Sequence, residues 1–204
     1  EDRRAKHKEY VQKVDFTDLK AFEAIIKSLP TSLILHLGNS STVRYAQLFP
    51  IDSNIELYCN RGTSGIDGST STAIGTSVVA KKQTMLITGD LSFFYDSNAF
   101  WNDHLPSSFR IILLNNSGGG IFRILPGAKE TSGFDKFFET QHKLTAKSLC
   151  DMYQMDYLLV DNTEDLEEAL EGFYIETGQA RVLEVDTSGC ANDEILLNYF
   201  DNIL

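Results

Sequence analysis

The sequence contains few of the residues that build disulfide frameworks or zinc sites. Its three cysteines, Cys59, Cys150 and Cys190, lie far apart, are odd in number and form no Cys-x-x-Cys pair. The four histidines show no metal-ligand spacing either. A structural zinc site and a disulfide framework are therefore not expected, and we expect reduced, partly buried thiols of the kind found in cytoplasmic proteins.

Positive charge and long apolar runs are also scarce. The chain carries 18 Lys and Arg against 29 Asp and Glu, a formal net charge of −11, which argues against nucleic acid or an anionic membrane as the main partner. A small anionic ligand stays compatible, because a local Arg or a helix N-terminus can hold one. No apolar run approaches the roughly 18 residues of a membrane span, and residues 1–14 lack the apolar core of a signal peptide. We therefore expect a cytoplasmic protein.

The residues that are present are typical of a domain with a packed core. Of the 204 residues, 42% are hydrophobic and 23% are charged, which excludes a disordered chain, a collagen-like chain and a small disulfide scaffold. At roughly 150 residues per domain, the length predicts one large domain or one domain with an appendage. We place the domain at residues 15–204 and interpret the charged residues 1–14 as a linker or short helix.

Hydrophobic periodicity predicts helices that alternate with strands along most of the chain. The predicted helices span residues 17–29, 41–49, 69–80, 96–104, 145–153 and 164–176, and the predicted strands span residues 32–37, 55–59, 84–88, 110–114, 157–160 and 181–186. This alternation predicts an α/β fold, a doubly wound, mostly parallel sheet with helices on both faces. Residues 115–143 form a long glycine-rich stretch, and such stretches are usually functional or mobile.

Four polar, glycine-rich segments follow predicted strands directly. They are residues 38–41, 60–68, 89–92 and 115–120. In a doubly wound sheet, ligands bind beyond the carboxyl ends of the strands, and backbone N–H groups at such exits bind anions. The sequence contains no P-loop, no clean dinucleotide fingerprint and no nucleophile-elbow motif. These four segments therefore form the candidate site.

Asp90 and Asn116 stand at the ends of two successive predicted strands. A carboxylate and an amide oxygen suit Mg²⁺ when the ligand adds phosphate oxygens. Alternatively, Asp90 caps the next helix and Asn116 forms a turn, and the spacing alone leaves both interpretations open. We interpret His36, inside an apolar strand, as a core histidine. Four aromatic residues between positions 93 and 101 are interpreted as helix-packing residues: Phe93, Phe94, Phe100 and Trp101.

The sequence also resembles a known enzyme family. Gly89-Asp90-Leu91 followed by Asn115-Asn116 is similar to the Gly-Asp-Gly…Asn-Asn motif of thiamine-diphosphate enzymes. The segments GNSSTVR (38–44), NRGTSGIDGSTSTAIG (60–75), GDLSFFYDSNAF (89–100) and ILLNNSGGGIFRILP (112–126) resemble the 2-succinyl-5-enolpyruvyl-6-hydroxy-3-cyclohexene-1-carboxylate synthase family of menaquinone biosynthesis, in which Gly-Asp-Leu-Ser is usual. The resemblance covers only that family's C-terminal, diphosphate-binding domain. It implies a fragment or expressed domain, with residues 1–14 as the linker from a preceding domain.

The resemblance also implies roles for individual residues. Asp90, Asn116 and the carbonyl of Gly118 would hold Mg²⁺, or Mn²⁺, against the diphosphate of thiamine diphosphate. Ile66 would lie under the cofactor and keep it bent. The residues implied to bind the cofactor or line its pocket are Ser40, Ile66, Gly89, Leu91, Ser92, Gly119, Ile121 and Phe122. The residues implied to face the substrates are Asn39, Arg44 and Arg61, and a guanidinium fork matches a carboxylate.

For the whole enzyme, the resemblance implies decarboxylation of 2-oxoglutarate and addition of the resulting succinyl carbanion to isochorismate. The activating glutamate would lie in the pyrimidine-binding domain of a partner subunit, within a homodimer or homotetramer. We therefore expect this chain alone to be inactive, to bind the cofactor weakly and to leave residues 115–143 poorly ordered. The alternatives are another thiamine-diphosphate lyase or transferase, similar to acetolactate synthase, a non-catalytic Mg²⁺-diphosphate or nucleotide-binding module, and an oligomerisation domain.

Overall fold

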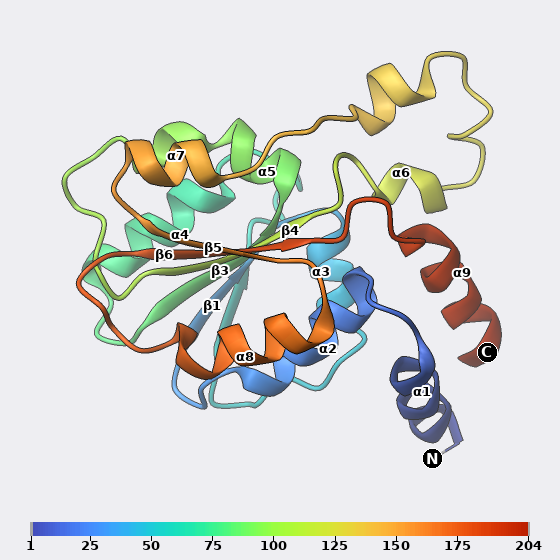
Figure 1. Cartoon of the computed structure of the whole chain (residues 1–204), viewed down its shortest axis with the longest axis horizontal. Coiled ribbons are helices and arrows are strands. Elements are labelled where there is room, and N and C mark those ends of the chain that lie inside the picture. The colour runs from blue at the N-terminus through green and yellow to red at the C-terminus, as the bar shows by residue number, and fades with distance from the viewer. Residues whose placement is uncertain (1, 204) are drawn as a thin grey trace.

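A six-stranded, all-parallel sheet forms the centre of the computed structural model, which describes residues 2–203 (Figure 1). The strands are β1 (Ile34–Leu37), β2 (Glu56–Cys59), β3 (Thr84–Gly89), β4 (Arg110–Asn115), β5 (Asp156–Val160) and β6 (Arg181–Asp186). Their order in the sheet is β2-β1-β3-β4-β6-β5. The predicted fold class is therefore confirmed. Glu1 and Leu204, the outermost residues of the predicted segments 1–14 and 15–204, lie outside the described residues.

Helices cover both faces of the sheet, with α4, α5 and α7 on one side and α2 and α8 on the other (Figure 1). The helices are α1 (Asp2–Lys13), α2 (Asp18–Ser28), α3 (Ser41–Ala46), α4 (Ser69–Val79), α5 (Asp90–Tyr95), α6 (Ile121–Ile124), α7 (Lys147–Met152), α8 (Thr163–Phe173) and α9 (Asn192–Ile203). The remaining helical elements of residues 2–203 are a 3₁₀ helix, η1 (Ser97–Phe100), and a π-helical turn, η2 (Asp135–Glu139).

The inner strands β3, β4 and β6 read as largely apolar runs because each of them contributes to two cores, whereas the edge strands β2 and β5 are more exposed. On β4, Ile112 and Leu114 pack into the core under α2 and α8, whereas Ile111 and Leu113 pack into the core under α4, α5 and α7. Successive residues of a strand point to opposite faces of the sheet, so a strand covered on both sides needs apolar residues at every position.

The strand order brings the four predicted exit segments to one edge of the sheet. The pairing register sets Leu37 of β1 beside Cys59 of β2, and Gly89 of β3 beside Leu114 of β4. The chain passes from β1 outward to β2 and then returns to β3 on the other side of β1. This reversal is the topological switch point at which doubly wound sheets bind ligands.

Three regions of the chain differ from the sequence-based prediction. The helix predicted at residues 96–104 is wrong, because α5 begins at Asp90 directly after β3 and only the 3₁₀ turn η1 follows. The Asp96 carboxylate accepts hydrogen bonds from the backbone N–H and hydroxyl of Ser71, and these bonds hold the chain at the point where α5 ends. Residues 115–143 contain the short helices α6 and η2, and the sequence-based prediction lacks α9.

The side chains interpreted as packing residues divide into two groups. Phe93 and Phe100 are buried, but Trp101 is 83% exposed, so its packing role is wrong. Trp101 lies just after the end of η1, so it is not part of a helix that could direct its ring toward the core. His36 is buried in β1 and stacks on Tyr58, and burial lowers the pKa of its imidazole, as suits a neutral core histidine. All three cysteines are unpaired.

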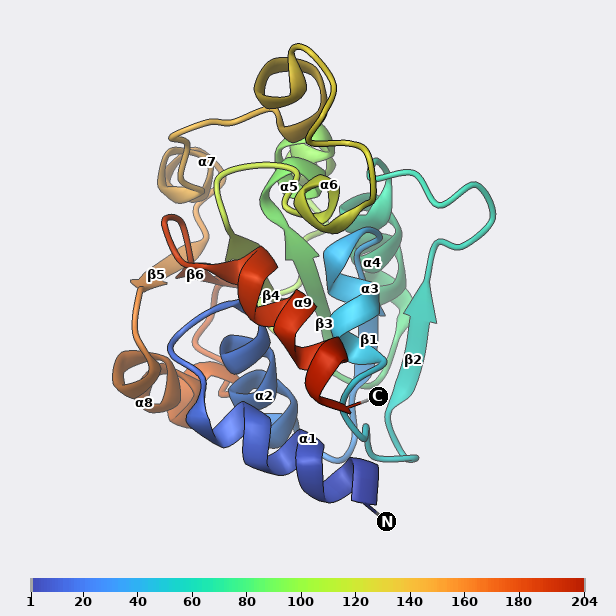
Figure 2. The same cartoon turned by 90° about the vertical axis from the view of Figure 1, so that its right-hand side faces the viewer.

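The first and last helices lie side by side (Figure 2). The hydroxyl of Tyr10 in α1 donates to the carbonyl of Ile195 in α9 (2.8 Å), and Nδ1 of His7 lies 2.8 Å from the hydroxyl of Tyr199. None of the helices within residues 2–203 has the length and apolar character that crossing a membrane requires.

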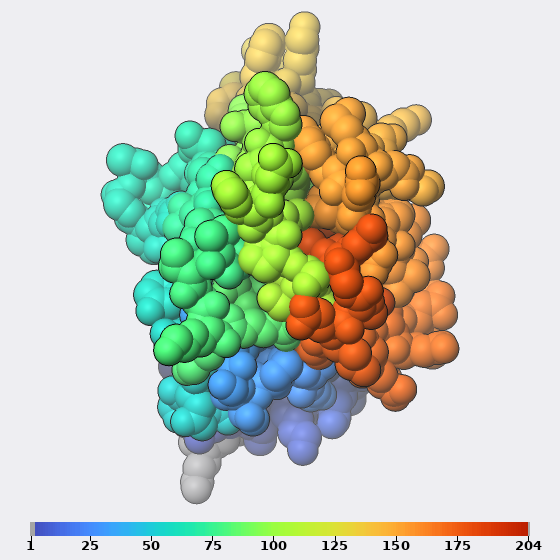
Figure 3. Space-filling model, turned by 90° about the vertical axis from the view of Figure 1, so that its left-hand side faces the viewer, coloured from blue at the N-terminus to red at the C-terminus, as the bar shows by residue number. Residues whose placement is uncertain are grey.

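At the amino ends of the strands, the segment before β4 lies against the segment between α8 and β6 (yellow-green against orange in Figure 3). Arg110, the first residue of β4, joins them and is completely buried. Its guanidinium donates to the carbonyls of Phe173 (2.7 Å), Ser107 (2.7 Å), Phe109 (2.9 Å) and Ile175 (2.5 Å). An arginine is uniquely able to serve four carbonyls because its planar fork carries five N–H donors.

Candidate functional site

A cavity of about 350 Å³ opens at the carboxyl ends of the strands and is lined by all four predicted exit segments. The predicted site residues that line it are Asn39, Ser40, Ile66, Gly89, Asp90, Leu91, Ser92, Asn116, Gly118, Gly119, Ile121 and Phe122. Arg44 and Arg61 are the predicted site residues outside this lining. The fold therefore brings together residues that lie up to about 80 positions apart in the sequence.

Asp90 joins the exits of β3 and β4. Its side chain is nearly buried, and Oδ2 accepts a hydrogen bond from the backbone N–H of Gly118 (2.8 Å). Oδ2 also lies 3.1 Å from Nε2 of His142, and Oδ1 accepts from the N–H of Leu91 (2.6 Å). Asp90 therefore accepts a hydrogen bond from the first turn of α5, and it also accepts one from the loop that follows the neighbouring strand β4. The cap interpretation alone does not account for this second contact.

Asn116 presents an unpaired oxygen at the site. The residue is only 8% exposed, and its Nδ2 donates to Oδ2 of Asp18 (2.8 Å). Its Oδ1 is buried and has no hydrogen-bond partner among the described residues. A buried amide oxygen without a partner costs about 1–3 kcal/mol. Such an oxygen fits a site that a cation completes.

Two glycines in the loop after β4 allow the backbone to pass close to its neighbours. Gly118 has a φ of +147°, and a Cβ on it would come within 2.6 Å of the carbonyl oxygen of Glu139. A Cβ on Gly120 would lie 2.9 Å from Nδ2 of Asn116. Gly120 therefore lies directly against the Asn116 amide, which a side chain at position 120 would have to displace, whereas a side chain at position 118 would meet the backbone of Glu139.

Backbone strain gathers at the same exits. Ser40, Ser64 and Ser117 adopt positive φ angles of 71°, 59° and 65°, which residues with a Cβ rarely adopt. Ser40 and Ser64 line the cavity, and Ser117 directly precedes Gly118. Strained backbone of this kind concentrates at ligand sites, where the surrounding structure holds it in place.

Asn39 connects the β1 exit to the loop of residues 60–68. Its Nδ2 donates to the carbonyls of Asn60 (2.8 Å) and Gly65 (2.6 Å), and its Oδ1 accepts from Nη1 of Arg61 (2.9 Å). The Asn39 amide is thus fully occupied within the protein. Arg44 donates to the carbonyl of Ser40 (2.7 Å). Both arginines are exposed and bonded to residues that line the cavity, so they lie at its rim.

Hydrogen bonds also link the loop of residues 60–68 to α5 and α4. The Ser92 hydroxyl donates to the carbonyl of Ile66, and Nδ2 of Asn60 donates to the hydroxyl of Thr72 in α4 (2.9 Å). These bonds hold Ile66 at the cavity wall between the exits of β2 and β3.

A buried polar network that sequence reasoning missed lies behind Asn116. Asp18 is buried at the start of α2, and its Oδ1 accepts from the hydroxyl of Thr187 (2.6 Å). Its backbone N–H donates to Oδ1 of Asn192 (2.8 Å). Burial raises the pKa of the Asp18 carboxyl and nearby Asp90 adds to this, while the bonds from Thr187 and Asn116 oppose it. The sequence gives no local signal that residue 18 meets residues 116, 187 and 192.

The donors at the site suit a hard cation. Among residues 2–203, no three His, Cys, Asp or Glu side chains form a group that could hold a metal ion. The cavity is lined by residues with oxygen atoms of another kind, which are the Asp90 carboxylate, the unpaired Asn116 Oδ1 and the carbonyl of Gly118, which accepts from the Gly120 N–H (2.9 Å). Three protein oxygens leave further positions for phosphate oxygens and water, which is how Mg²⁺ is usually bound.

Comparison with known proteins gives consistent matches. Residues 38–185 match the family model described as thiamine pyrophosphate enzyme, C-terminal TPP binding domain. Two relatives are named 2-succinyl-5-enolpyruvyl-6-hydroxy-3-cyclohexene-1-carboxylate synthase. The protein from Christiangramia forsetii is 53% identical over 98% of this chain, and the protein from Flavobacterium psychrophilum is 55% identical over 95% of it. The chain covers 34% and 35% of these relatives, about a third of their length.

Among solved structures, benzoylformate decarboxylase from Polynucleobacter necessarius superposes with a TM-score of 0.69. The match covers 85% of this chain and 33% of that protein, at 17% sequence identity. At this level of identity the similarity concerns the fold. The parallel sheet and its helices are therefore an arrangement that is already known to fold within a larger protein.

Proposed function

Since the chain belongs to the thiamine pyrophosphate enzyme family, as a C-terminal TPP-binding domain, we propose that its cavity at the strand exits holds the diphosphate of thiamine diphosphate with a divalent cation. The observation that carries this proposal is the unpaired, buried Oδ1 of Asn116, in the same cavity as the Asp90 carboxylate. Mg²⁺ is the proposed cation, and Mn²⁺ would suit the same oxygen donors.

The other cavity residues have proposed roles around the cofactor. The backbone at Ser40, Gly89, Leu91, Ser92 and Gly119 would approach the phosphates, and exposed N–H groups at such exits bind anions. Ile66, held in place by Ser92, would support the bent cofactor from below. Ile121 and Phe122 would form the apolar wall.

For the whole protein, the curated relatives support one reaction. We propose decarboxylation of 2-oxoglutarate and transfer of the succinyl unit to isochorismate, in the cytoplasm and within menaquinone biosynthesis. When bound, thiamine diphosphate supplies the carbon nucleophile and the electron sink for this chemistry. Arg44 and Arg61, at the cavity rim, would bind substrate carboxylates, and Asn39 would hold Arg61 toward them.

The proposed reaction also needs residues outside this chain. A glutamate of the pyrimidine-binding domain of a partner subunit would activate the cofactor, in a homodimer or homotetramer. We therefore expect the chain alone to show no turnover with 2-oxoglutarate, isochorismate, Mg²⁺ and thiamine diphosphate. The assay is formation of the transferase product, and turnover at an ordinary enzymatic rate would contradict the need for a partner.

Titration of the chain separates the proposed function from a nucleotide-binding role. Isothermal titration calorimetry with thiamine diphosphate should show weak binding that depends on Mg²⁺, with only a small rise in melting temperature, because ligand stabilisation follows concentration relative to Kd. Binding is expected to be weak since half of the cofactor would lie against another domain. ADP with Mg²⁺ is the control. Equal or tighter binding of ADP would favour a nucleotide module instead.

A further inference from the structure

The Asn116 amide can be seated in two ways that differ by half a turn. One orientation directs Oδ1 into the site, and the other directs the NH₂ group there. The two atoms occupy almost the same space, so packing against Gly120 does not distinguish them. Only an oxygen can ligate a cation, because an NH₂ group carries donors. Some other group must therefore determine the orientation.

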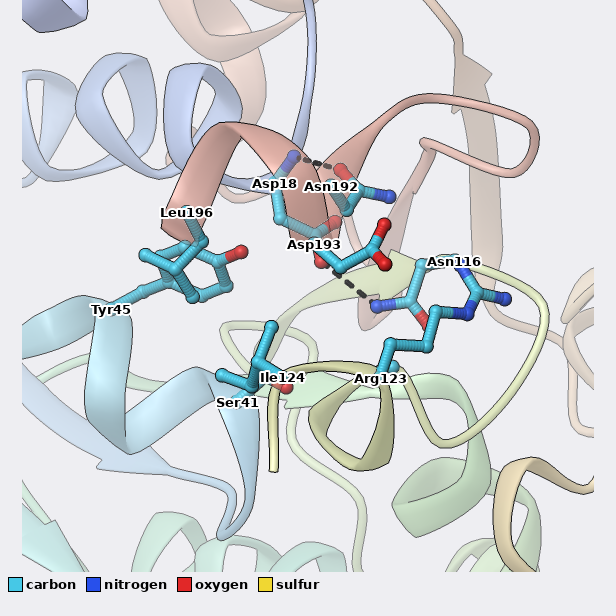
Figure 4. Close-up of a pocket in the computed structure, with 10 residues that line it drawn as sticks. Asp18, Ser41, Tyr45, Asn116, Arg123, Ile124, Asn192, Asp193 and Leu196 are labelled. Atoms are coloured by element: carbon cyan, nitrogen blue, oxygen red, sulfur yellow. Dashed lines mark hydrogen bonds between the residues drawn. The ribbon is translucent and has the colours of Figure 1, made fainter. Parts of the chain in front are cut away.

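Asp18 has the chemistry to make this selection. In its ionised form, which burial opposes and the bonds from Thr187 and Asn116 favour, the Asp18 carboxylate only accepts hydrogen bonds, so it favours the orientation in which Asn116 Nδ2 faces it. That bond is present at 2.8 Å (Figure 4). The orientation leaves Oδ1 buried and unpaired at the site.

Two residues near the C-terminal end of the fold hold Asp18 in place. The Thr187 hydroxyl occupies its other oxygen, and its backbone N–H is bound by Asn192 at the start of α9 (Figure 4). Nδ2 of Asn192 in turn donates to the carbonyl of Thr187 (3.0 Å). The carboxylate therefore cannot turn away from Asn116 without breaking buried hydrogen bonds.

We propose that Asp18 is a positioning residue that fixes the amide orientation of Asn116, so that Oδ1 and not Nδ2 faces the divalent cation. The inference rests on the proposed function for the identity of the cation. It concerns a residue of α2 that lies far along the sequence from both strand exits.

The variant Asp18→Asn tests the proposal sharply. Asn at position 18 can accept from Thr187 through its Oδ1 and donate through its Nδ2. Asn116 would then turn, accept that bond through Oδ1 and present its NH₂ group to the site. The hydrogen bonds are kept, so the melting temperature should change little. The affinity for Mn²⁺ in the presence of inorganic pyrophosphate, measured by electron paramagnetic resonance, should fall about 10- to 100-fold.

The double variant D18N/N116D should restore the site. A carboxylate at position 116 accepts the Asn bond with one oxygen and offers the other to the cation in either orientation. Most of the Mn²⁺ affinity lost in D18N should therefore return. Asp96→Asn is the matched control, since Asp96 is also buried and bonded at a helix end, to Ser71, but lies outside the cavity lining. Its Mn²⁺ affinity should equal that of the unmodified chain.

A measurement without metal tests the orientation independently of the proposed function. In the unmodified chain, the side-chain NH₂ protons of Asn116 should exchange slowly with solvent by NMR because Asp18 holds them, and in D18N they should exchange quickly. Unchanged exchange in D18N overturns the inference, as does unchanged Mn²⁺ affinity. Failure of the unmodified chain to bind Mn²⁺ with pyrophosphate, while D18N speeds exchange, would instead reject the cation site and leave the amide orientation supported.

Discussion

Replacing Asp90 with asparagine should abolish measurable Mg²⁺-dependent binding of thiamine diphosphate to this chain. The new amide oxygen can still accept the Gly118 N–H, so the link between the β3 and β4 exits can persist. The negative charge is lost, however, and removing one partner of a buried charge pair costs about 2–5 kcal/mol or more. A loss of about 2.7 kcal/mol corresponds to about 100-fold in Kd.

Calorimetric titration at ligand concentrations that saturate the unmodified chain is the measurement. The melting temperature should stay close to that of the unmodified chain, which shows that the loss concerns binding. Asp96→Asn again serves as the control, and it should bind the cofactor normally. An Asp90→Asn chain that binds within a few-fold of the unmodified chain would mean that Asp90 does not hold the cation.

The second large effect concerns stability at the opposite end of the sheet. Replacing Arg110 with methionine should lower the free energy of unfolding by about 3–5 kcal/mol, because buried or partly buried carbonyls, including those of Phe173 at the end of α8 and Ile175 after it, lose the Arg110 donor. Burial and nearby Arg181 lower the pKa of the Arg110 guanidinium, but four carbonyl contacts stabilise the charge.

Urea unfolding followed by circular dichroism would measure this change. Arg44→Met is the matched control, since Arg44 is exposed and makes one carbonyl contact, and its effect should stay below about 1 kcal/mol. Arg110→Lys should fall between the two, because a lysine keeps the charge but lacks the planar fork. Equal midpoints for Arg110→Met and Arg44→Met would show that the carbonyls find water instead.

The sequence supports prediction of the parts of the fold that depend on local patterns. Continuous apolar runs mark the strands, and the polar segments after them mark the edge at which Asp90 and Asn116 share a cavity. The position of α5 could not be predicted in this way, because Asp96, which ends the helix, acts through a contact with Ser71 in another helix. No local pattern indicates such a contact.

The missed parts of the site have the same physical origin. Asp18 looks like an ordinary acidic residue in the first turn of a helix, where negative charge is generally favourable. Its role depends on Thr187 and Asn192, which only the folded chain brings to it. The helix α9 is a different kind of omission, because Ile195, Leu196 and Tyr199 do carry a helical spacing that can be recognised in the sequence.

The meeting of α1 and α2 with α9 has a consequence for biosynthesis. Asp18 emerges from the ribosome long before Thr187 and Asn192. Thr187 bonds the Asp18 carboxylate and Asn192 bonds its backbone N–H, and both belong to the last part of this chain to be synthesised. Domains generally fold as units. Here β1, β3 and β4 are synthesised well before α9, but Asp18 can form its bonds to Thr187 and Asn192 only once the start of α9 has emerged. A nascent chain stalled before that helix would carry a sheet without a finished ligand site.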